Sequence, residues 1–276
     1  MIDSPVSFQT MTSVGFIGGG SMAYAIIKGI AGSVLAKDTQ LFACDHHAEK
    51  LARLAELGVT ACETDLDVVK RCKYVFLAVK PQVFEDMLAQ IASGVTKDTV
   101  LVSIAAGITA EYIRSKTIPE AKIVLVMPNT PLLVGQGATA LAQIAPTTDE
   151  EFGVVRGFFD ACGVTSAIPE NKMNEIIPIN GSSPAFIYLF AKAFMDYADK
   201  VGIPRETAMP LFAQTLIGSA KMLTDSGCSI DELIKMVTSP GGTTLAGLDE
   251  LYKGKLEQTV ANACDSCTKR AYELSK

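Results

Sequence analysis

The feature of this sequence that most constrains its fold is a glycine-rich segment directly after a short apolar run. Residues 14–17 form the run, and they lead straight into Gly18, Gly19, Gly20, Ser21, Met22 and Ala23. In this G-x-G-x-x-A pattern, Gly18 permits a tight turn, Gly20 lets the backbone approach a pyrophosphate, and Ala23 lets the following helix pack closely on the strand. That helix presents free N–H groups and a positive dipole end to the phosphates. The order of strand, glycines and helix therefore predicts a dinucleotide site formed by Gly18, Gly19, Gly20, Ser21 and Met22.

The first half of the chain alternates short apolar runs with segments of helical length. The runs are mostly apolar throughout rather than alternating, and they are residues 14–17, 40–44, 74–79, 100–104 and 123–127. Such runs are typical of parallel strands that helices cover on both faces. Helical segments at residues 22–35 and 49–57 separate the first three runs. The alternation predicts an α/β fold with a doubly wound Rossmann sheet over residues 13–168.

The rest of the chain, residues 169–276, has a helical pattern without further strands. Apolar side chains recur every three or four positions in residues 184–201, 205–223 and 255–274, as they do in amphipathic helices. Ser229 and Glu232 match a capping box that opens a shorter helix. Because helices over this length form only a thin core, a second copy would cover the remaining apolar face. We therefore expect an all-helical C-terminal dimerisation domain and a homodimer.

The residue after the second apolar run bears on which dinucleotide binds. Asp45 stands there, followed by His46 and His47. An acidic residue at this position usually accepts a hydrogen bond from the adenosine ribose 2′-hydroxyl, which favours NAD, whereas a basic residue favours the 2′-phosphate of NADP. The histidines either supply a weak positive charge, depending on their protonation, or lie in an exposed turn. These residues leave the choice of dinucleotide open.

Composition excludes several classes of function. The chain has 276 residues, 49% of them hydrophobic, and a net charge of −6. An acidic protein gains little from counterion release, so we expect no nucleic-acid partner. No apolar run approaches the roughly 18–20 residues of a membrane helix, so we expect no membrane association. Residues 1–12 lack the basic and apolar regions of a signal peptide and the arginines of a transit peptide, and we expect a disordered extension there.

The cysteines are scattered along the chain, at Cys44, Cys62, Cys72, Cys162, Cys228, Cys264 and Cys267. Only Cys264 and Cys267 have a CxxC spacing, and they lie in a helical pattern without a second pair. Neither a zinc site nor a redox site is expected from such a pattern. We therefore expect no metal, and reduced thiols in a cytoplasmic protein.

Five further motifs follow the glycine-rich segment in order. They are FLAVKPQ at residues 76–82, VSIAAGI at 102–108, VMPNTP at 126–131, GSSPAF at 181–186 and SPGGTTLAGL at 239–248. Together with GFIGGGSMA at residues 15–23, this series resembles the pyrroline-5-carboxylate reductase family, from about Ser13 to the end of the chain. The resemblance implies NAD(P)H-dependent reduction of the cyclic imine 1-pyrroline-5-carboxylate to L-proline, with NADPH as the cofactor and NADH as the alternative. It also implies homodimers through the helical domain, which family members often assemble into rings.

Three positions depart from the family pattern. Ser183 replaces the central glycine of a GSGPA-type motif. Asp45 and His46 stand where the family tends to place a small polar residue or Asn followed by Arg, and Asp65 stands where many relatives carry Asn near the adenosine. We expect Asp45, His46 and Asp65 to line the adenosine end of the site. The two acidic residues keep the preference between NADPH and NADH open.

The segment from Ser239 to Thr244, SPGGTT, is the expected substrate loop. Its two glycines expose backbone N–H groups at an expected helix start, which suits a carboxylate. By resemblance, Thr244 is the catalytic residue that hydrogen-bonds the ring nitrogen of a substrate bound already protonated. The expected carboxylate contacts are Ser239, Gly241, Gly242 and Thr243. The alternative is an ordinary turn with N-capping threonines.

Residues after the other predicted strands are expected to complete the site, because ligands bind at the carboxyl ends of parallel strands. The expected cofactor contacts are Ala78, Val79, Lys80 and Pro81 after the third strand, and Ala105, Ala106 and Gly107, which leave room for the nicotinamide, after the fourth. The alternative for Lys80 is a solvated lysine at a strand end. The alternative for Ala105, Ala106 and Gly107 is tight packing under the next helix. Asn129, after the fifth strand, either contacts the substrate or shapes its loop. Ser182 is expected to line the substrate pocket, and Ser183 either joins it or caps a helix.

Two other functions fit a Rossmann domain followed by helices. A 3-hydroxyacid dehydrogenase needs a catalytic lysine on the first long helix, where Lys192 lies, but the GSSPAF and SPGGTT motifs do not match that family. A non-catalytic dinucleotide sensor has no use for an intact SPGGTT loop. Both stay as alternatives to the reductase.

Overall fold

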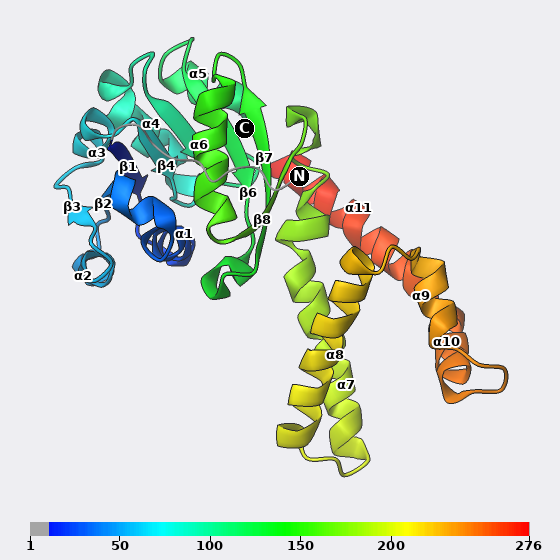
Figure 1. Ribbon diagram of the computed structural model, residues 1–276. Helices are drawn as coiled ribbons and strands as arrows, with labels where there is room; N and C mark the ends of the chain where they lie inside the picture. Colours follow the sequence, from blue (N-terminus) through cyan, green and yellow to red (C-terminus); the bar gives the residue numbers. More distant parts are fainter. Residues whose placement is uncertain (1–10, 276) are drawn as a thin grey trace. The chain divides into compact units, whose positions relative to one another are not determined.

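The computed structural model describes residues 11–275 of the chain (Figure 1). The extension predicted over residues 1–12 falls almost entirely outside the described residues, and Thr12 already belongs to the first strand. The described chain forms two compact units, residues 11–184 with 267–275, and residues 185–266. The chain thus leaves the first unit and returns to it near its end. The domain boundary expected at residue 168 stays a prediction.

The first unit is built on an eight-stranded sheet with the order β3-β2-β1-β4-β5-β6-β7-β8. Neighbouring strands pair in parallel except for β6 and β7, which are antiparallel. The strands are β1 (Thr12–Ile17), β2 (Thr39–Cys44), β3 (Thr60–Ala61), β4 (Tyr74–Leu77), β5 (Val100–Ser103), β6 (Lys122–Met127), β7 (Gly137–Ile144) and β8 (Gly163–Ala167). The first six strands follow the Rossmann order, which confirms the predicted doubly wound α/β fold.

Three strands of this sheet, β3, β7 and β8, are not among those predicted. β3 has only two residues, and β8 is largely exposed, so neither has a buried apolar run. β7 is buried along most of its length, but its sequence GATALAQI is rich in alanine and poor in β-branched residues. β4 and β5 also end earlier than predicted, at Leu77 and Ser103. The expected cofactor contacts that follow β4 and β5 therefore lie in loops, except Pro81, which begins a 3₁₀ turn.

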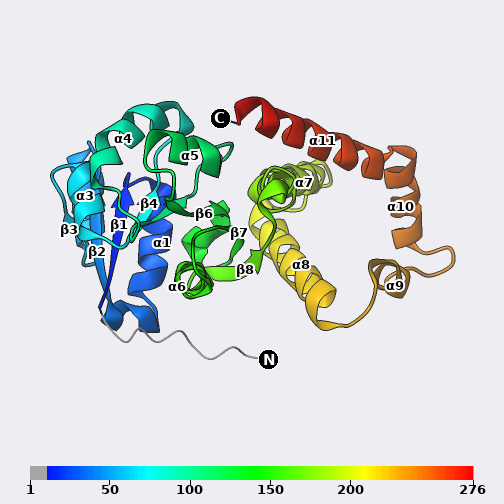
Figure 2. The same cartoon turned by 90° about the horizontal axis from the view of Figure 1, so that it is seen from above.

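Helices cover both faces of the sheet, and Figure 2 shows the two layers. Side chains of α1, α2 and α6 bury against one face, and side chains of α3, α4 and α5 against the other. These helices are α1 (Ser21–Ala31), α2 (Ala48–Ala55), α3 (Asp65–Arg71), α4 (Phe84–Ile91), α5 (Ala110–Lys116) and α6 (Asp149–Asp160). Phe16 of β1 and Phe76 of β4 stack with ring centroids 4.5 Å apart in the first of these cores. Burial on two sides explains why the central strands are apolar throughout.

The first helix is shorter than the sequence pattern indicates. The expected helix spans residues 22–35, whereas α1 ends at Ala31 because Gly32 follows and the chain enters a 3₁₀ turn that begins at Val34. The side chain of Ser33 caps this turn by accepting a hydrogen bond from the Leu35 N–H group. The 3₁₀ helices are η1 (Val34–Asp38), η2 (Pro81–Val83), η3 (Ala92–Gly94), η4 (Thr130–Val134) and η5 (Glu170–Lys172).

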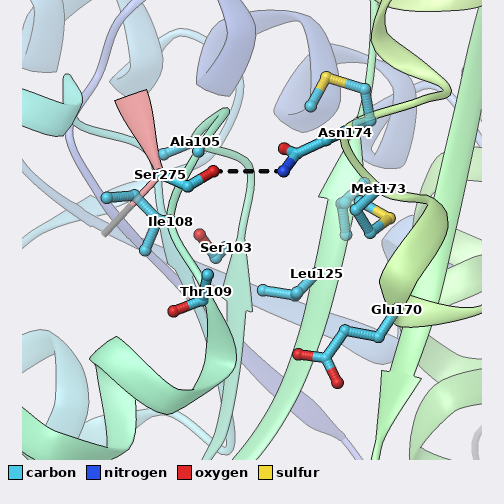
Figure 3. A pocket seen from close by; sticks show the side chains of 12 residues that line it. Ser103, Ala105, Ile108, Thr109, Leu125, Glu170, Met173, Asn174 and Ser275 are labelled. Atoms are coloured by element: carbon cyan, nitrogen blue, oxygen red, sulfur yellow. Dashed lines mark hydrogen bonds between the residues drawn. The ribbon is translucent and has the colours of Figure 1, made fainter. Parts of the chain in front are cut away.

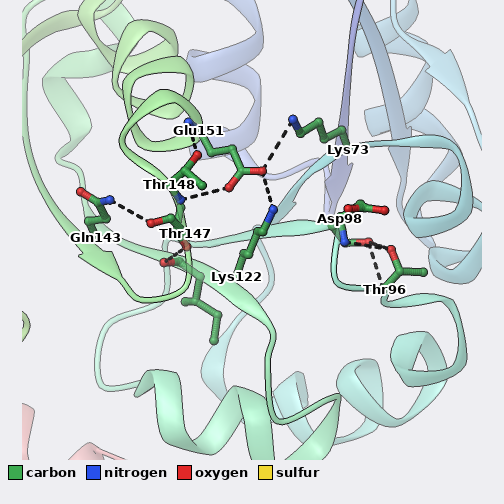
Figure 4. A network of polar contacts seen from close by, with 10 residues as sticks. Lys73, Thr96, Asp98, Lys122, Gln143, Thr147, Thr148 and Glu151 are labelled. Carbon is green, nitrogen blue, oxygen red and sulfur yellow. Dashed lines mark hydrogen bonds and ion pairs between the residues drawn. The ribbon is translucent and has the colours of Figure 1, made fainter.

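A buried carboxylate ties α6 to the sheet (Figure 4). Glu151 is 6% exposed, and its carboxylate accepts a hydrogen bond from the Thr148 N–H group in a capping box. The same carboxylate contacts Lys122 Nζ at 2.7 Å and Lys73 Nζ at 3.6 Å. Burial raises the pKa of Glu151, but the hydrogen bonds from Lys122 and Thr148 outweigh burial and hold that pKa below its usual range. The charged carboxylate thus joins α6 to β6 and to the start of β4.

The described residues after Ala167 contain helices and no strand, as predicted. The helices are α7 (Ser183–Lys200), α8 (Arg205–Asp225), α9 (Ile230–Met236), α10 (Thr243–Lys253) and α11 (Leu256–Leu274). The capping box of Ser229 and Glu232 is confirmed at the start of α9. Phe194 of α7 stacks on Phe212 of α8 with ring centroids 4.5 Å apart. No helix among residues 11–275 is both long enough and apolar enough to cross a membrane.

A π-helix, Ile177–Gly181, leads directly into α7. The Ser182 N–H group donates to the Ile177 carbonyl five residues earlier, at 2.8 Å. The chain is therefore already helical before Ser183, whose hydroxyl donates backwards to the Ile179 carbonyl at 2.7 Å. The alternative that Ser183 caps the first long helix is wrong, because the preceding helical turn occupies the capping position.

Candidate active site

The glycine-rich loop lies where the strand order reverses, between the carboxyl ends of β1 and β4. Gly18 has φ +98°, and a Cβ atom there would lie 2.7 Å from the Ala78 carbonyl oxygen of the neighbouring strand end. Only glycine fits both restrictions. The Gly18 N–H group donates to the Cys44 carbonyl at 2.8 Å, which joins the loop to the end of β2. The loop conformation is therefore the tight turn that the sequence predicts.

The start of α1 is open to a ligand. Gly20 is the N-cap residue, and a Cβ atom built on it would meet nothing within 4 Å. No side chain caps the helix, and its first turn holds no acidic residue. Ala23 is fully buried against the sheet, while Ser21 is exposed and Met22 half-buried. An uncapped helix start beside free space suits a pyrophosphate, so the residues present fit a dinucleotide.

Asp45 follows β2 beside this loop, but its carboxylate is largely enclosed. Oδ2 accepts from the Gly19 N–H group at 2.8 Å, and Oδ1 accepts from the His47 N–H group at 2.8 Å. His47 Nδ1 lies 2.9 Å from Oδ1, and Lys50 Nζ lies 3.3 Å from Oδ1 and 3.1 Å from Oδ2. Burial raises the pKa of Asp45, but the hydrogen bonds from Gly19, His47 and Lys50 outweigh burial and lower that pKa to about 2.

Asp65 and His46 stand nearby, and they share an electrostatic environment with Asp45. Asp65 is the first residue of α3. Burial raises the pKa of Asp65 above its usual value, although the hydrogen bond from the Cys44 thiol and the nearby His46 lower it in part. His46 is exposed beside the loop. The structure thus gathers the three predicted adenosine-end residues at one place, together with Lys50, which the sequence analysis missed. A cation five residues after Asp45, in the first turn of a helix, is the signal that points to Lys50.

The loops after β4 and β5 reach the same edge of the sheet. The Ala78 N–H group donates to the Ile17 carbonyl at 2.9 Å, so this loop lies against the glycine-rich loop. Val79 and Pro81 are half-buried and Lys80 is exposed. Beyond β5, Ala105 is half-buried and Ala106 exposed.

Gly107 closes the loop after β5 beside the end of α11. Its φ is +76°, and a Cβ atom there would lie 3.2 Å from the Leu274 backbone. A pocket opens next to it, lined by residues from β5 and the loop after it, from β6, from η5 and the turn after it, and from the end of the described chain, including Ser103, Ala105, Asn174 and Ser275 (Figure 3). Ser103 is 1% exposed and its hydroxyl has no partner among the described residues. Asn174 and Ser275 hydrogen-bond across the pocket at 3.2 Å. This pocket lies within the first compact unit.

Asn129 is buried, and both the nitrogen and the oxygen of its side-chain amide form hydrogen bonds. Its Nδ2 donates to the Asn180 carbonyl at 3.1 Å, and its Oδ1 accepts from the Ala138 N–H group at 2.9 Å. Asn180 in turn donates from Nδ2 to the Met127 carbonyl at 2.7 Å. These bonds join the loop after β6, the start of β7 and the π-helix, which supports the loop-shaping alternative. Ser182, half-buried, lies 3.1 Å from the Cys267 thiol.

The SPGGTT loop lies in the second compact unit, before α10. Gly241 has φ +70°, and the Gly242 N–H group donates to the Ser239 carbonyl at 2.9 Å. Gly242 is the N-cap residue of α10, and no side chain caps this helix. Thr243 and Thr244 are its first two residues, so the alternative of N-capping threonines is wrong. Both hydroxyls are exposed beside uncapped N–H groups, an arrangement that can hold a carboxylate.

Other reactive side chains in the described chain do not form a competing site. Lys192, which a hydroxyacid dehydrogenase would use, forms an ion pair with Asp196 on the surface of α7. All cysteines are free thiols, and burial raises the pKa of Cys162 to about 12. No group of three His, Cys, Asp or Glu side chains within residues 11–275 is placed to hold a metal ion.

Comparisons with known proteins match both parts of the chain. The family model for pyrroline-5-carboxylate reductase dimerisation matches residues 170–274, and that for NADP oxidoreductase coenzyme F420-dependent matches residues 13–107. The pyrroline-5-carboxylate reductase of Pisum sativum is 36% identical over 263 residues, which cover 95% of this chain and 96% of that protein.

Solved structures agree with this sequence match. A pyrroline-5-carboxylate reductase from Coxiella burnetii has a TM-score of 0.88 at 29% identity, covering 97% of this chain and 100% of that one. The Plasmodium falciparum enzyme, solved with NADP bound, has a TM-score of 0.86 at 28% identity, covering 96% of this chain and 98% of that one. The dimerisation match also supports homo-oligomerisation through the helical part. The sequence match to the Pisum sativum enzyme extends over nearly the whole length of both chains, and the dimerisation model matches the helical part. This chain therefore belongs to the pyrroline-5-carboxylate reductase family.

Proposed function

We propose that this protein reduces 1-pyrroline-5-carboxylate to L-proline with NADPH as hydride donor and NADH as the alternative donor. The observation that carries the proposal is the glycine-rich loop at the sheet's reversal point, with an uncapped α1 and free space at Gly20. A reductase of this family needs such a site, and a nicotinamide dinucleotide supplies the hydride when bound there. A cytoplasmic location and a ring of dimers stay predictions.

The residues of the first unit would position the cofactor. Backbone N–H groups at the start of α1, from Ser21 and Met22, would hold the pyrophosphate. The loop from Ala78 to Pro81 would border the ribose, because its backbone lies against Gly18. The small side chains of Ala105 and Ala106 would leave room for the nicotinamide ring at the carboxyl end of β5.

The SPGGTT loop would position the substrate. Its uncapped helix start, with Gly241 and Gly242, would bind the carboxylate without any arginine. Thr244 would orient the protonated ring nitrogen through its hydroxyl. Holding the ring in this way makes the reaction with the hydride donor effectively intramolecular. Proton-transfer groups are not required, since an iminium ion already carries its proton.

The substitution Thr244→Ala tests this assignment. We expect kcat/KM for 1-pyrroline-5-carboxylate to fall about 10- to 100-fold, because a hydrogen bond to a charged group is lost, while the dissociation constant of NADPH stays unchanged. Rates are followed by loss of NADPH absorbance, and binding by calorimetry. Thr165→Ala is the matched control, because it removes a half-buried hydroxyl on β8, in the other compact unit, that bonds Asp160 and Arg156. Equal loss of NADPH binding would show that Thr244 belongs to the cofactor site instead. Turnover of 3-hydroxyacids without turnover of the imine would refute the proposed reaction.

A further inference from the structure

The adenosine end of the site holds an ion pair that no part of the proposed reaction uses. Lys50 Nζ contacts both carboxylate oxygens of Asp45, at 3.1 and 3.3 Å. The side chain of Asp45 is 8% exposed, whereas that of Lys50 is 37% exposed. The carboxylate is therefore fixed, and the ammonium is the partner that is free to move.

The carboxylate of Asp45 has no spare acceptor position. An ionised carboxylate offers about four lone-pair sites. Five contacts already fill them, from the Gly19 N–H group, the His47 N–H group, the His47 ring and Lys50, which touches both oxygens. A ribose 2′-hydroxyl can donate to Asp45 only if one of these partners withdraws. The two backbone donors are held by the loop and by the start of α2, so Lys50 and the His47 ring are the partners that can leave.

A ligand phosphate at the same place meets opposing charges. Asp45 stays ionised because its pKa is about 2, and it would repel a 2′-phosphate at close range. Asp65 is a second carboxyl group close to Asp45, and burial together with the charge of Asp45 raises the pKa of Asp65. The Arg53 guanidinium lies over the Tyr24 ring at 3.5 Å, which holds it on α1. Of the groups that contact Asp45, Lys50 is the one with a permanent positive charge.

We propose that Lys50 is the residue that lets this chain accept NADPH, by transferring its contact from Asp45 to the 2′-phosphate. With NADH, the His47 ring withdraws, Lys50 stays near Asp45, and the ribose 2′-hydroxyl donates to the carboxylate. One flexible cation thus serves both dinucleotides, while the fixed Asp45 limits NADPH affinity. The inference rests on the proposed binding of a nicotinamide dinucleotide at this loop.

The test measures binding of adenosine fragments rather than turnover. Calorimetric titration of the full-length protein with 2′,5′-ADP and with 5′-AMP isolates the contribution of the 2′-phosphate. For Lys50→Met we expect at least a tenfold loss of 2′,5′-ADP affinity, because a charge-assisted contact to the phosphate is lost, and a loss of less than about threefold for 5′-AMP, which has no 2′-phosphate. Lys50→Arg should restore most of the 2′,5′-ADP affinity, which excludes misfolding as the cause. Lys97→Met, an exposed lysine before β5, is the matched control.

Asp45→Asn gives the opposite expectation. Removing its charge should raise 2′,5′-ADP affinity about tenfold or more relative to 5′-AMP. Equal effects of Lys50→Met on both fragments, or no effect on either, would overturn the inference. If the imine is not reduced but the fragments still respond as expected, the proposed reaction fails and the inference about Lys50 stands.

Discussion

Two glycines of the same loop, Gly18 and Gly20, have different physical reasons to be glycine. At Gly18 the backbone has φ +98° and a Cβ atom would collide with the Ala78 carbonyl oxygen, so the folded chain itself requires glycine. At Gly20 the backbone is extended and the space around it is free, so only a bound ligand would require glycine.

We therefore expect Gly18→Ala and Gly20→Ala to separate stability from binding. Gly18→Ala should lower the free energy of unfolding by about 1–3 kcal/mol through backbone strain and collision. Gly20→Ala should change that free energy by less than about 1 kcal/mol, yet weaken NADPH binding about tenfold or more by occupying the phosphate space. Urea unfolding and calorimetric titration check the two expectations. A stable Gly18→Ala protein would contradict the geometry of the turn.

The predictability of the candidate site differs from residue to residue. The glycines are predictable because their restrictions come from the local backbone and are the same in any chain with this turn. Asp45 is predictable in position but not in its contacts, because its partner Gly19 is 26 residues away along the chain. The hydrogen bond that the Asn129 side chain donates depends on the backbone carbonyl of Asn180, which lies 51 residues later in the sequence. Contacts of this kind appear only when the tertiary structure brings the segments together.

Among the elements, α6 depends on one buried carboxylate. We expect Glu151→Gln to destabilise the protein by about 3 kcal/mol, because it keeps the size of the capping side chain but leaves Lys122 near the sheet without its charged partner. Equilibrium unfolding in urea measures the loss. Glu150→Gln, at the exposed neighbouring position in the same helical turn, is the control and should change stability by less than about 0.5 kcal/mol. Equal effects of the two substitutions would mean that the ion pairs of Glu151 contribute nothing.

Elements buried on both sides are predictable from the sequence, and elements defined by their neighbours are not. The five central strands have apolar runs because helices cover both faces. β7 is mostly buried but is rich in alanine and lacks a run of β-branched residues, so its antiparallel pairing with β6 is not evident from its own sequence. The π-helix contains Pro178, which in the sequence resembles a loop signal. It is stabilised by long-range hydrogen bonds from Asn180, which no local pattern reveals.

At the scale of the whole molecule, the helical unit leaves much apolar surface uncovered. Leu189 of α7 is 69% exposed and Leu211 of α8 is 67% exposed. We expect Leu211→Glu to raise the dissociation constant of the homodimer about a hundredfold or more, because the interface would have to desolvate a charge. Analytical ultracentrifugation measures this change. Val34→Glu, at an equally exposed apolar position in the first unit, is the control and should leave the oligomer intact. An unaltered oligomer in Leu211→Glu would place the interface elsewhere.

The return of the chain to its first unit has a consequence for how the protein can be divided. The chain crosses between the units after Pro184 and again before Cys267, and each crossing lies inside a continuous helix, α7 or α11. A fragment that stops at Pro184 therefore lacks residues 267–275 of the first unit, among them Ser275, which lines the pocket beside Gly107.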